Sequence, residues 1–173
     1  MSQPTAFAVA FLVELEQECG PTRSLLAKLP EGKLDWRPHP KSQSLGQLAM
    51  HVASLPENIV GMVAAGTFDA STVDFKSPQP RSTREIQEAF ELGLPKARAA
   101  LSGWSEADFE ASWRLVMGTK ELMAMPRGTV LRKLLLNHLY HHRGQLTVYL
   151  RLLDVPLPSV YGPTADAAVF ANA

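Results

Sequence analysis

Apolar residues recur at intervals of three and four positions along most of this 173-residue chain, and this is the spacing of amphipathic helices. The spacing predicts helices over residues 5–28, 45–65 and 83–101, and a fourth helix from Thr129 to about Leu153. Between the first three helices the chain is polar and rich in proline, which is typical of connecting loops. We therefore expect a chain dominated by four long helices.

Serine residues mark where two of these helices should begin. Ser44 is suited to cap the second helix, and Ser82 begins the S-x-x-E pattern of a capping box at the third. Pro56 lies inside the second helical pattern, so it must kink the helix or mark a restart. Ser54 begins another S-x-x-E pattern beside it, which favours a restart.

Residues 105–125 carry the weakest pattern in the chain. Trp113, Leu115 and Met117 occupy alternate positions, but three alternations are too few to predict a strand. We expect a loop containing at most a short helix. Four main helices without a sustained strand or an internal repeat predict an all-α fold, an up-and-down four-helix bundle. The length fits a single domain over residues 1–173.

The charge balance narrows the set of partners. Seventeen basic and seventeen acidic side chains cancel, so the chain has no overall field to hold nucleic acid or an anionic membrane surface. No segment reaches the run of about 18 apolar residues that spans a bilayer. The apolar N-terminal stretch lacks a basic lead-in and runs into Glu14, Glu16 and Glu18, so it predicts a helix rather than a signal peptide.

Cys19 is the one cysteine in the sequence, so an intramolecular disulfide cannot form. This fits a protein of the reducing cytoplasm, where we expect this chain to reside. We expect Cys19 itself to be a small apolar packing residue rather than a nucleophile.

The chemistry-bearing residues gather in the fourth predicted helix, where residues 137–150 read NHLYHHRGQLTVYL. At about 100° per residue, an apolar stripe lies within roughly 80° of His138. The members of that stripe are Leu131, Leu134, Leu135, His142, Leu146, Tyr149 and Leu153. His138 and His142 therefore lie in the middle of the expected buried face, while His141 falls at its edge.

Two neutral imidazoles on a buried face need partners, because each unsatisfied group costs about 1–3 kcal/mol. One divalent metal ion can satisfy both, since positions i and i+4 share a face. The alternative is a pair of core histidines that bond to backbone, tyrosine or carboxylate groups. The spacing alone leaves both interpretations open.

A metal centre needs a third protein ligand, and His51 is the best candidate. It lies on the second predicted helix at about 40° from Leu55, at the border of the apolar stripe, where it can face the fourth helix. His39 lies in a proline-rich loop and should be solvated. Leu139 follows His138, so the glutamate of an H-E-x-x-H peptidase is missing, and this argues against peptide hydrolysis.

Three segments together resemble the DinB family (DinB/YfiT-like metalloenzymes). They are WRPHPKSQSLGQLAMHVA at 36–53, HLYHHRGQLTVYLRLLDVPLP at 138–158 and SVYGPTAD at 159–166, in the order and separation typical of that family. The resemblance covers most of the chain. It implies a four-helix bundle, commonly a homodimer, with a divalent metal ion held by three histidines at one end.

Carried over by position, the resemblance makes His51, His138 and His142 the metal ligands, with water or substrate in the remaining positions. One residue departs from the family pattern, because similar members often read YGPSADE and Ala167 stands here where a glutamate is common. If that carboxylate has a role elsewhere in the family, the role is vacant here or passes to Asp166.

The resemblance also implies an activity, because characterised relatives use low-molecular-weight thiols such as bacillithiol or mycothiol. A bound cation lowers the pKa of a thiol and presents the thiolate as a nucleophile. We expect a metal-dependent, thiol-linked transferase acting on a small electrophile, with Arg143 or His141 steering an anionic group. For Arg143 the alternative is a structural salt bridge or a dimer contact.

Three imidazoles suit several divalent metals, of which we expect Zn or Ni, with Fe or Mn as alternatives. Two other functions remain open from the sequence. A small-molecule hydrolase would need a base, for which Asp166 is the candidate. A non-catalytic metal-binding or stress-associated protein would need the three histidines alone.

Overall fold

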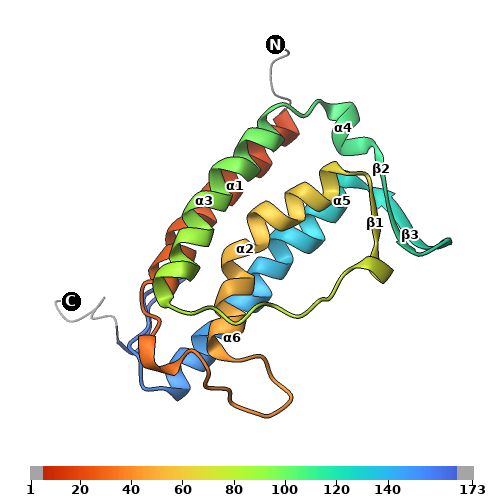
Figure 1. Cartoon of the computed structure of the whole chain (residues 1–173). Coiled ribbons are helices and arrows are strands. Elements are labelled where there is room, and N and C mark those ends of the chain that lie inside the picture. The colour runs from red at the N-terminus through yellow and green to blue at the C-terminus, as the bar shows by residue number, and fades with distance from the viewer. Residues whose placement is uncertain (1–5, 167–173) are drawn as a thin grey trace.

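The computed structural model describes residues 6–166, and over this range the chain is mostly helical with one small sheet (Figure 1). Its long elements are α1 (Ala6–Leu26), α2 (Leu45–Ala64), α3 (Thr83–Ser102) and a continuous helical rod made of α5 (Arg127–Val130), a π-helical segment (Leu131–Asn137) and α6 (His138–Leu152). Its short elements are α4 (Glu106–Glu110), β1 (Thr67–Asp69), β2 (Ser112–Met117) and β3 (Lys120–Pro126).

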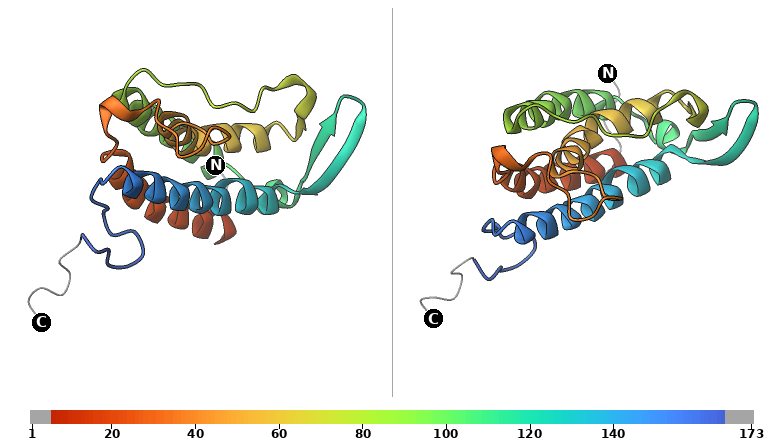
Figure 2. Two further views of the ribbon diagram at one scale, coloured as in Figure 1. Left: turned by 90° about the horizontal axis from the view of Figure 1, so that it is seen from below. Right: turned by 60° about the horizontal axis from the view of Figure 1, so that its bottom comes forward.

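The four long helical segments lie side by side, but they do not alternate in direction. The chain leaves α2 near the sheet, returns along the molecule through residues 65–82 and enters α3 at the opposite end (Figures 1 and 2). As a result α2 and α3 run in the same direction and pack against each other along their lengths. The predicted up-and-down order is therefore wrong at this connection.

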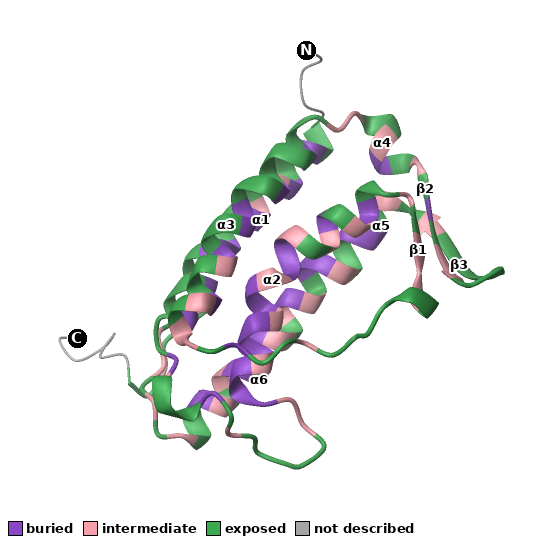
Figure 3. Ribbon diagram, viewed as in Figure 1, coloured by how far each residue is buried: buried purple, intermediate pink, exposed green. Residues whose placement is uncertain are grey.

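The core lies between the long helices, which turn their buried sides inward (Figure 3). Every long segment contributes fully buried leucine or phenylalanine side chains, each worth roughly 1.5–3 kcal/mol when removed from water. Examples are Leu15 and Leu25 of α1, Leu48 and Leu55 of α2, Phe90 and Leu101 of α3, and Leu135 and Leu146 of the rod. The bounds predicted for the three separate helices are confirmed to within about two residues. The sequence also predicts that Gly20-Pro21 kinks or splits the first helix, and α1 runs through Pro21 without a split.

The helix starts follow the predicted caps, whereas the predicted restart at Pro56 is wrong. Ser44 accepts a hydrogen bond from the backbone N–H of Gln47, and the Gln47 side chain accepts from Ser44 in return. Ser82 accepts from the backbone N–H three residues on. Helix α2 continues through Pro56, and the Ser54 hydroxyl donates to the carbonyl of His51 instead of capping a new helix.

The sheet contradicts the expectation of an all-α fold. Residues 105–125 form α4, β2 and part of β3, where the sequence predicted a loop. Strand β2 pairs antiparallel with β3 through a turn at Gly118, whose φ is 60°, and it pairs parallel with β1. Trp113 is 1% exposed and donates its indole N–H to the carbonyl of Met62, which joins the sheet to α2.

A buried guanidinium ties α6 to α1 and to the C-terminal tail. Arg143 is 2% exposed and donates to the Glu18 carboxylate at 2.5 Å, to the Glu18 carbonyl, to the Thr22 hydroxyl and to the Tyr161 hydroxyl. The ring of Tyr140 lies beside the same guanidinium. Arg143 therefore makes a structural salt bridge, and its burial leaves it no route to steer a substrate.

We predict that replacing Arg143 destabilises the fold strongly. Arg143→Met should reduce the free energy of unfolding by about 3–5 kcal/mol, because it leaves the Glu18 carboxylate buried without a cation. Urea unfolding followed by circular dichroism measures this change. The matched control is Arg98→Met, which removes an exposed pair with Glu16 and should change stability by no more than about 1 kcal/mol. Equal losses in the two variants would contradict the assignment.

Candidate metal centre

Three histidines from two packed helices meet at one point. The Nε2 atoms of His51 and His138 are 3.4 Å apart, and those of His138 and His142 are 2.6 Å apart. One ligand atom from each of the three lies within 4.8 Å of the others. The sequence proposed this same triad, and the packing of α2 against α6 brings its members together across 87 positions of chain.

The other two histidines lie outside the triad. His39 is exposed in the loop before α2, where its Nδ1 accepts from the backbone N–H of Lys41. His141 is exposed on α6, with its ring centroid 4.9 Å from that of His142. His141 is therefore beside the cluster and open to solvent, as expected for an edge position.

The triad lies at the rim of the core rather than in its middle, which corrects the sequence interpretation. The buried residues of α6 are Leu139, Arg143, Leu146 and Leu150, while the three histidines are half-buried. The π-helical segment Leu131–Asn137 explains the difference. Its i to i+5 hydrogen bonds widen the turn, so a count at 100° per residue misplaces the leucines before His138 relative to the histidines.

Partial burial keeps all three imidazoles neutral. Burial, followed by the nearby His142 and His138, lowers the pKa of His51 to about 4. Burial also lowers the pKa of His138, against an opposing effect of the Leu134 backbone, and the pKa of His142, against an opposing effect of Gln145. Neutral imidazole is the form that binds a metal ion, so near pH 7 the ligands need not first lose protons.

Gln145 is a residue of the site for which sequence analysis found no role. Its side-chain oxygen lies 2.7 Å from Nδ1 of His142, one helical turn earlier. With a proton on Nδ1, the lone pair of His142 is left on Nε2, the atom that faces the other two histidines. The i, i+3 spacing in HRGQL is the signal that could have shown this contact in advance.

The positions open to the ring protons of the three imidazoles favour a cation between their Nε2 atoms. Two Nε2 lone pairs 2.6 Å apart repel unless a proton or a cation lies between them. A proton on Nε2 of His138 would leave its Nδ1 without one, and Nδ1 is buried with no hydrogen-bond partner in bonding geometry. A shared cation instead accepts all three lone pairs and lets Nδ1 of His138 carry a proton towards the Leu134 carbonyl. The three residues thus fit a divalent metal ion.

The ligand set is neutral and incomplete. Within residues 6–166, no cysteine or carboxylate ligand atom joins the three histidines. Three protein ligands leave at least one coordination position free, as in catalytic rather than structural metal sites. A divalent ion there would keep its full charge and would attract an anionic partner.

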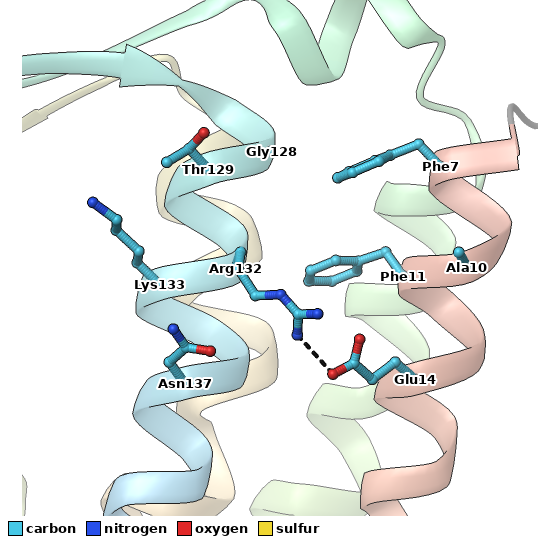
Figure 4. Close-up of a pocket in the computed structure, with 9 residues that line it drawn as sticks. All are labelled: Phe7, Ala10, Phe11, Glu14, Gly128, Thr129, Arg132, Lys133 and Asn137. Carbon is cyan, nitrogen blue, oxygen red and sulfur yellow. Dashed lines mark hydrogen bonds and ion pairs between the residues drawn. The ribbon is translucent and has the colours of Figure 1, made fainter.

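A cavity of about 420 Å³ lies elsewhere, between α1 and the start of the helical rod (Figure 4). Phe7 and Phe11 form one wall, and Arg132 crosses from the other side to pair with Glu14 at 2.6 Å. None of the three histidines lines it.

Within residues 6–166, no helix combines the length and the apolar composition needed to cross a membrane.

Asp166 does not have the environment of a base. It forms an ion pair with Arg151 and accepts from the backbone N–H of Leu157 at 2.9 Å, so its carboxylate is occupied by two partners. Arg151, with Leu157, holds the pKa of this carboxyl below its usual range. Ala167, where the family often has a glutamate, lies outside the described residues.

A mostly helical chain in which two packed helices bring three neutral histidines together defines a candidate metal-binding protein. The chain belongs to the DinB family, whose sequence profile matches residues 1–168. The family resemblance found in the sequence is thereby confirmed.

Known proteins of this kind are similar over nearly their full length. The uncharacterized protein YrdA of Bacillus subtilis strain 168 is 26% identical over 160 residues, which cover 90% of this chain and 89% of YrdA. A DinB-like protein from Bacillus cereus ATCC 10987 superposes with a TM-score of 0.68 at 26% identity, over 87% of this chain and 95% of that one. A DinB family member from Exiguobacterium sibiricum 255-15 gives 0.63 at 21% identity, over 94% and 98%.

We predict that the protein retains about one divalent ion per chain when it is purified without a nickel column and reloaded with Zn, Ni, Mn or Fe. His138→Ala and His142→Ala should each lose the ion, since two imidazoles make a poor site. His39→Ala removes an exposed histidine and serves as the matched control. Elemental analysis after gel filtration measures the content. Wild-type protein that retains none of the four metals would disprove the site.

We also predict that Cys19 is unreactive in the folded protein. The side chain is 2% exposed, and burial raises the pKa of its thiol to about 11. At pH 8 a disulfide reagent should therefore modify it more than about 100-fold more slowly than in denaturant. The release of the chromophore from the reagent follows the reaction. Rapid modification of the native protein would mean that the thiol is accessible.

Proposed function

We propose that this protein is a metal-dependent transferase that joins a low-molecular-weight thiol to a small electrophile. The observation that carries the proposal is the cluster of three neutral imidazoles, which no acidic ligand joins within the described residues 6–166 and which would leave a bound ion a free coordination position. A divalent ion held by His51, His138 and His142 would supply Lewis acidity, lowering the pKa of a bound thiol and favouring its thiolate. We favour Zn or Ni, with Fe or Mn as alternatives.

The chain's own residues support a thiol that comes from solution. Cys19 is buried, and its Sγ lies 3.0 Å from the carbonyl of Leu15, so it cannot act as the nucleophile. The neutral ligands leave the positive charge of the ion uncompensated, which favours an anionic partner such as a thiolate. His141 is exposed beside His142 and can approach an incoming group from the solvent side.

The setting of the site is part of the same proposal. We propose a single-domain chain whose long helices form a DinB/YfiT-like four-helix bundle and which works as a homodimer in the cytoplasm. Two exposed apolar side chains on one face of α1, Val9 and Val13, support a contact between two copies. The single unpaired cysteine supports a reducing compartment.

A small-molecule hydrolase is the second candidate, since a bound metal ion can also activate water. It is less well supported because Asp166, the base proposed from the sequence, is paired with Arg151 and Leu157. A non-catalytic metal-binding or stress-associated role needs the triad alone, and the activity assay separates it from both enzymes.

The test is metal-dependent consumption of a thiol. Protein loaded in turn with Zn, Ni, Mn and Fe is mixed with a chromogenic aryl halide and with bacillithiol, mycothiol or glutathione. We expect at least one combination to accelerate thioether formation by more than about tenfold, with the rate lost in His138→Ala and kept in His39→Ala. Ester cleavage without added thiol would favour the hydrolase. Metal binding without either reaction would favour the non-catalytic role.

A further inference from the structure

Gln145 is the one side chain outside the triad that hydrogen-bonds to a triad imidazole within residues 6–166. Its Oε1 lies 2.7 Å from Nδ1 of His142, and both residues belong to α6. No side chain supports His138 in this way, because its buried Nδ1 faces the Leu134 backbone and has no partner in bonding geometry. Among the three histidines, His142 is therefore the one whose ring orientation can be changed by replacing a single side chain, Gln145.

The direction of this hydrogen bond follows from the crowding on the other side of the ring. An amide NH2 turned towards Nδ1 would require a lone pair there and would move the ring proton to Nε2. That proton would then point at Nε2 of His138, only 2.6 Å away, and would block the lone pair of His142 from a shared cation. With the amide oxygen towards Nδ1, both sides of the ring are satisfied when an ion is bound.

The choice of an amide rather than a carboxylate also has an electronic effect. A carboxylate on Nδ1 would pull the ring towards imidazolate character, make it a stronger ligand and reduce the positive charge of the centre. The neutral amide orients the ring and leaves the charge of the ion undiminished. The undiminished charge of the ion strengthens its attraction for an anionic group at the free coordination position.

We propose that Gln145 is a positioning residue of the metal centre, which fixes the tautomer and the rotation of His142 and thereby sets the affinity for the metal ion. This inference rests on the metal centre of the proposed function and adds Gln145 as a residue that supports one of its ligands. It requires no direct contact between Gln145 and the ion or the substrate.

The experiment compares Gln145→Leu, Gln145→Glu and the control Gln17→Leu, which places the same change on an exposed position of α1. The dissociation constant for Zn is measured by competition with a chromophoric chelator. We expect Gln145→Leu to weaken binding about 10–100-fold, because partners of metal-bound histidines have effects of this size. Gln145→Glu should bind at least as tightly as the wild type, and Gln17→Leu should match the wild type.

A second measurement follows the tautomer directly in the metal-free protein. Long-range ¹H–¹⁵N correlation spectra of the histidine rings should place the His142 proton on Nδ1 in the wild type and in Gln145→Glu. In Gln145→Leu the signal should shift towards a mixture of the two tautomers. Gln145 is exposed, so the variant should keep its fold, and its melting temperature confirms this.

The outcomes separate this inference from the proposed function. If the wild type binds Zn and Gln145→Leu binds it equally tightly, the role of Gln145 is overturned and the metal centre stands. A His142 proton found on Nε2 in the wild type overturns the role as well. If the wild type binds no metal at all, the proposed function fails, and no role of Gln145 in metal affinity remains.

Discussion

The placing of the histidine triad depends on one buried cation. Arg143 lies in the core and reaches its partners Glu18 and Thr22 on α1, so this side of α6 must face α1. His142 is the preceding residue, and its side chain is turned by about 100°, towards α2 and His51. Because a buried guanidinium without its partners is costly, the rotation of α6 is fixed strongly. The salt bridge thus turns His142 towards α2, the helix that supplies the third ligand, His51.

The sequence predicted the helices well because their signals are local. The caps at Ser44 and Ser82 and the apolar spacing of α2 and α3 depend on residues within a few positions of each other. The sheet could not be predicted this way, because the Trp113 indole donates to the distant carbonyl of Met62 and β2 pairs with residues 67–69. Long-range pairing of this kind leaves almost no trace in local alternation.

The sequence predicted which histidines form the site but not how far they are buried. His51, His138 and His142 share faces that simple angle counting identifies. The same counting assumes one helix type throughout, and the π-helical turns before His138 break that assumption. Gln145 was missed for another reason, since its i, i+3 spacing from His142 is shared by many pairs of exposed polar residues on a helix. The hydrogen bond to the His142 ring shows which of these pairs matters.

The chain distance between the ligands gives the metal centre a further property. His51 and His138 are separated by 87 positions, so the triad forms only when α2 and α6 pack together, with residues 65–82, α3 and the sheet lying between them in the chain. An ion that binds the closed triad and not the unfolded chain stabilises the whole fold, by about 2.7 kcal/mol when its free concentration is 100 times the dissociation constant. The folding equilibrium of the entire helical chain is then coupled to the supply of free metal around it.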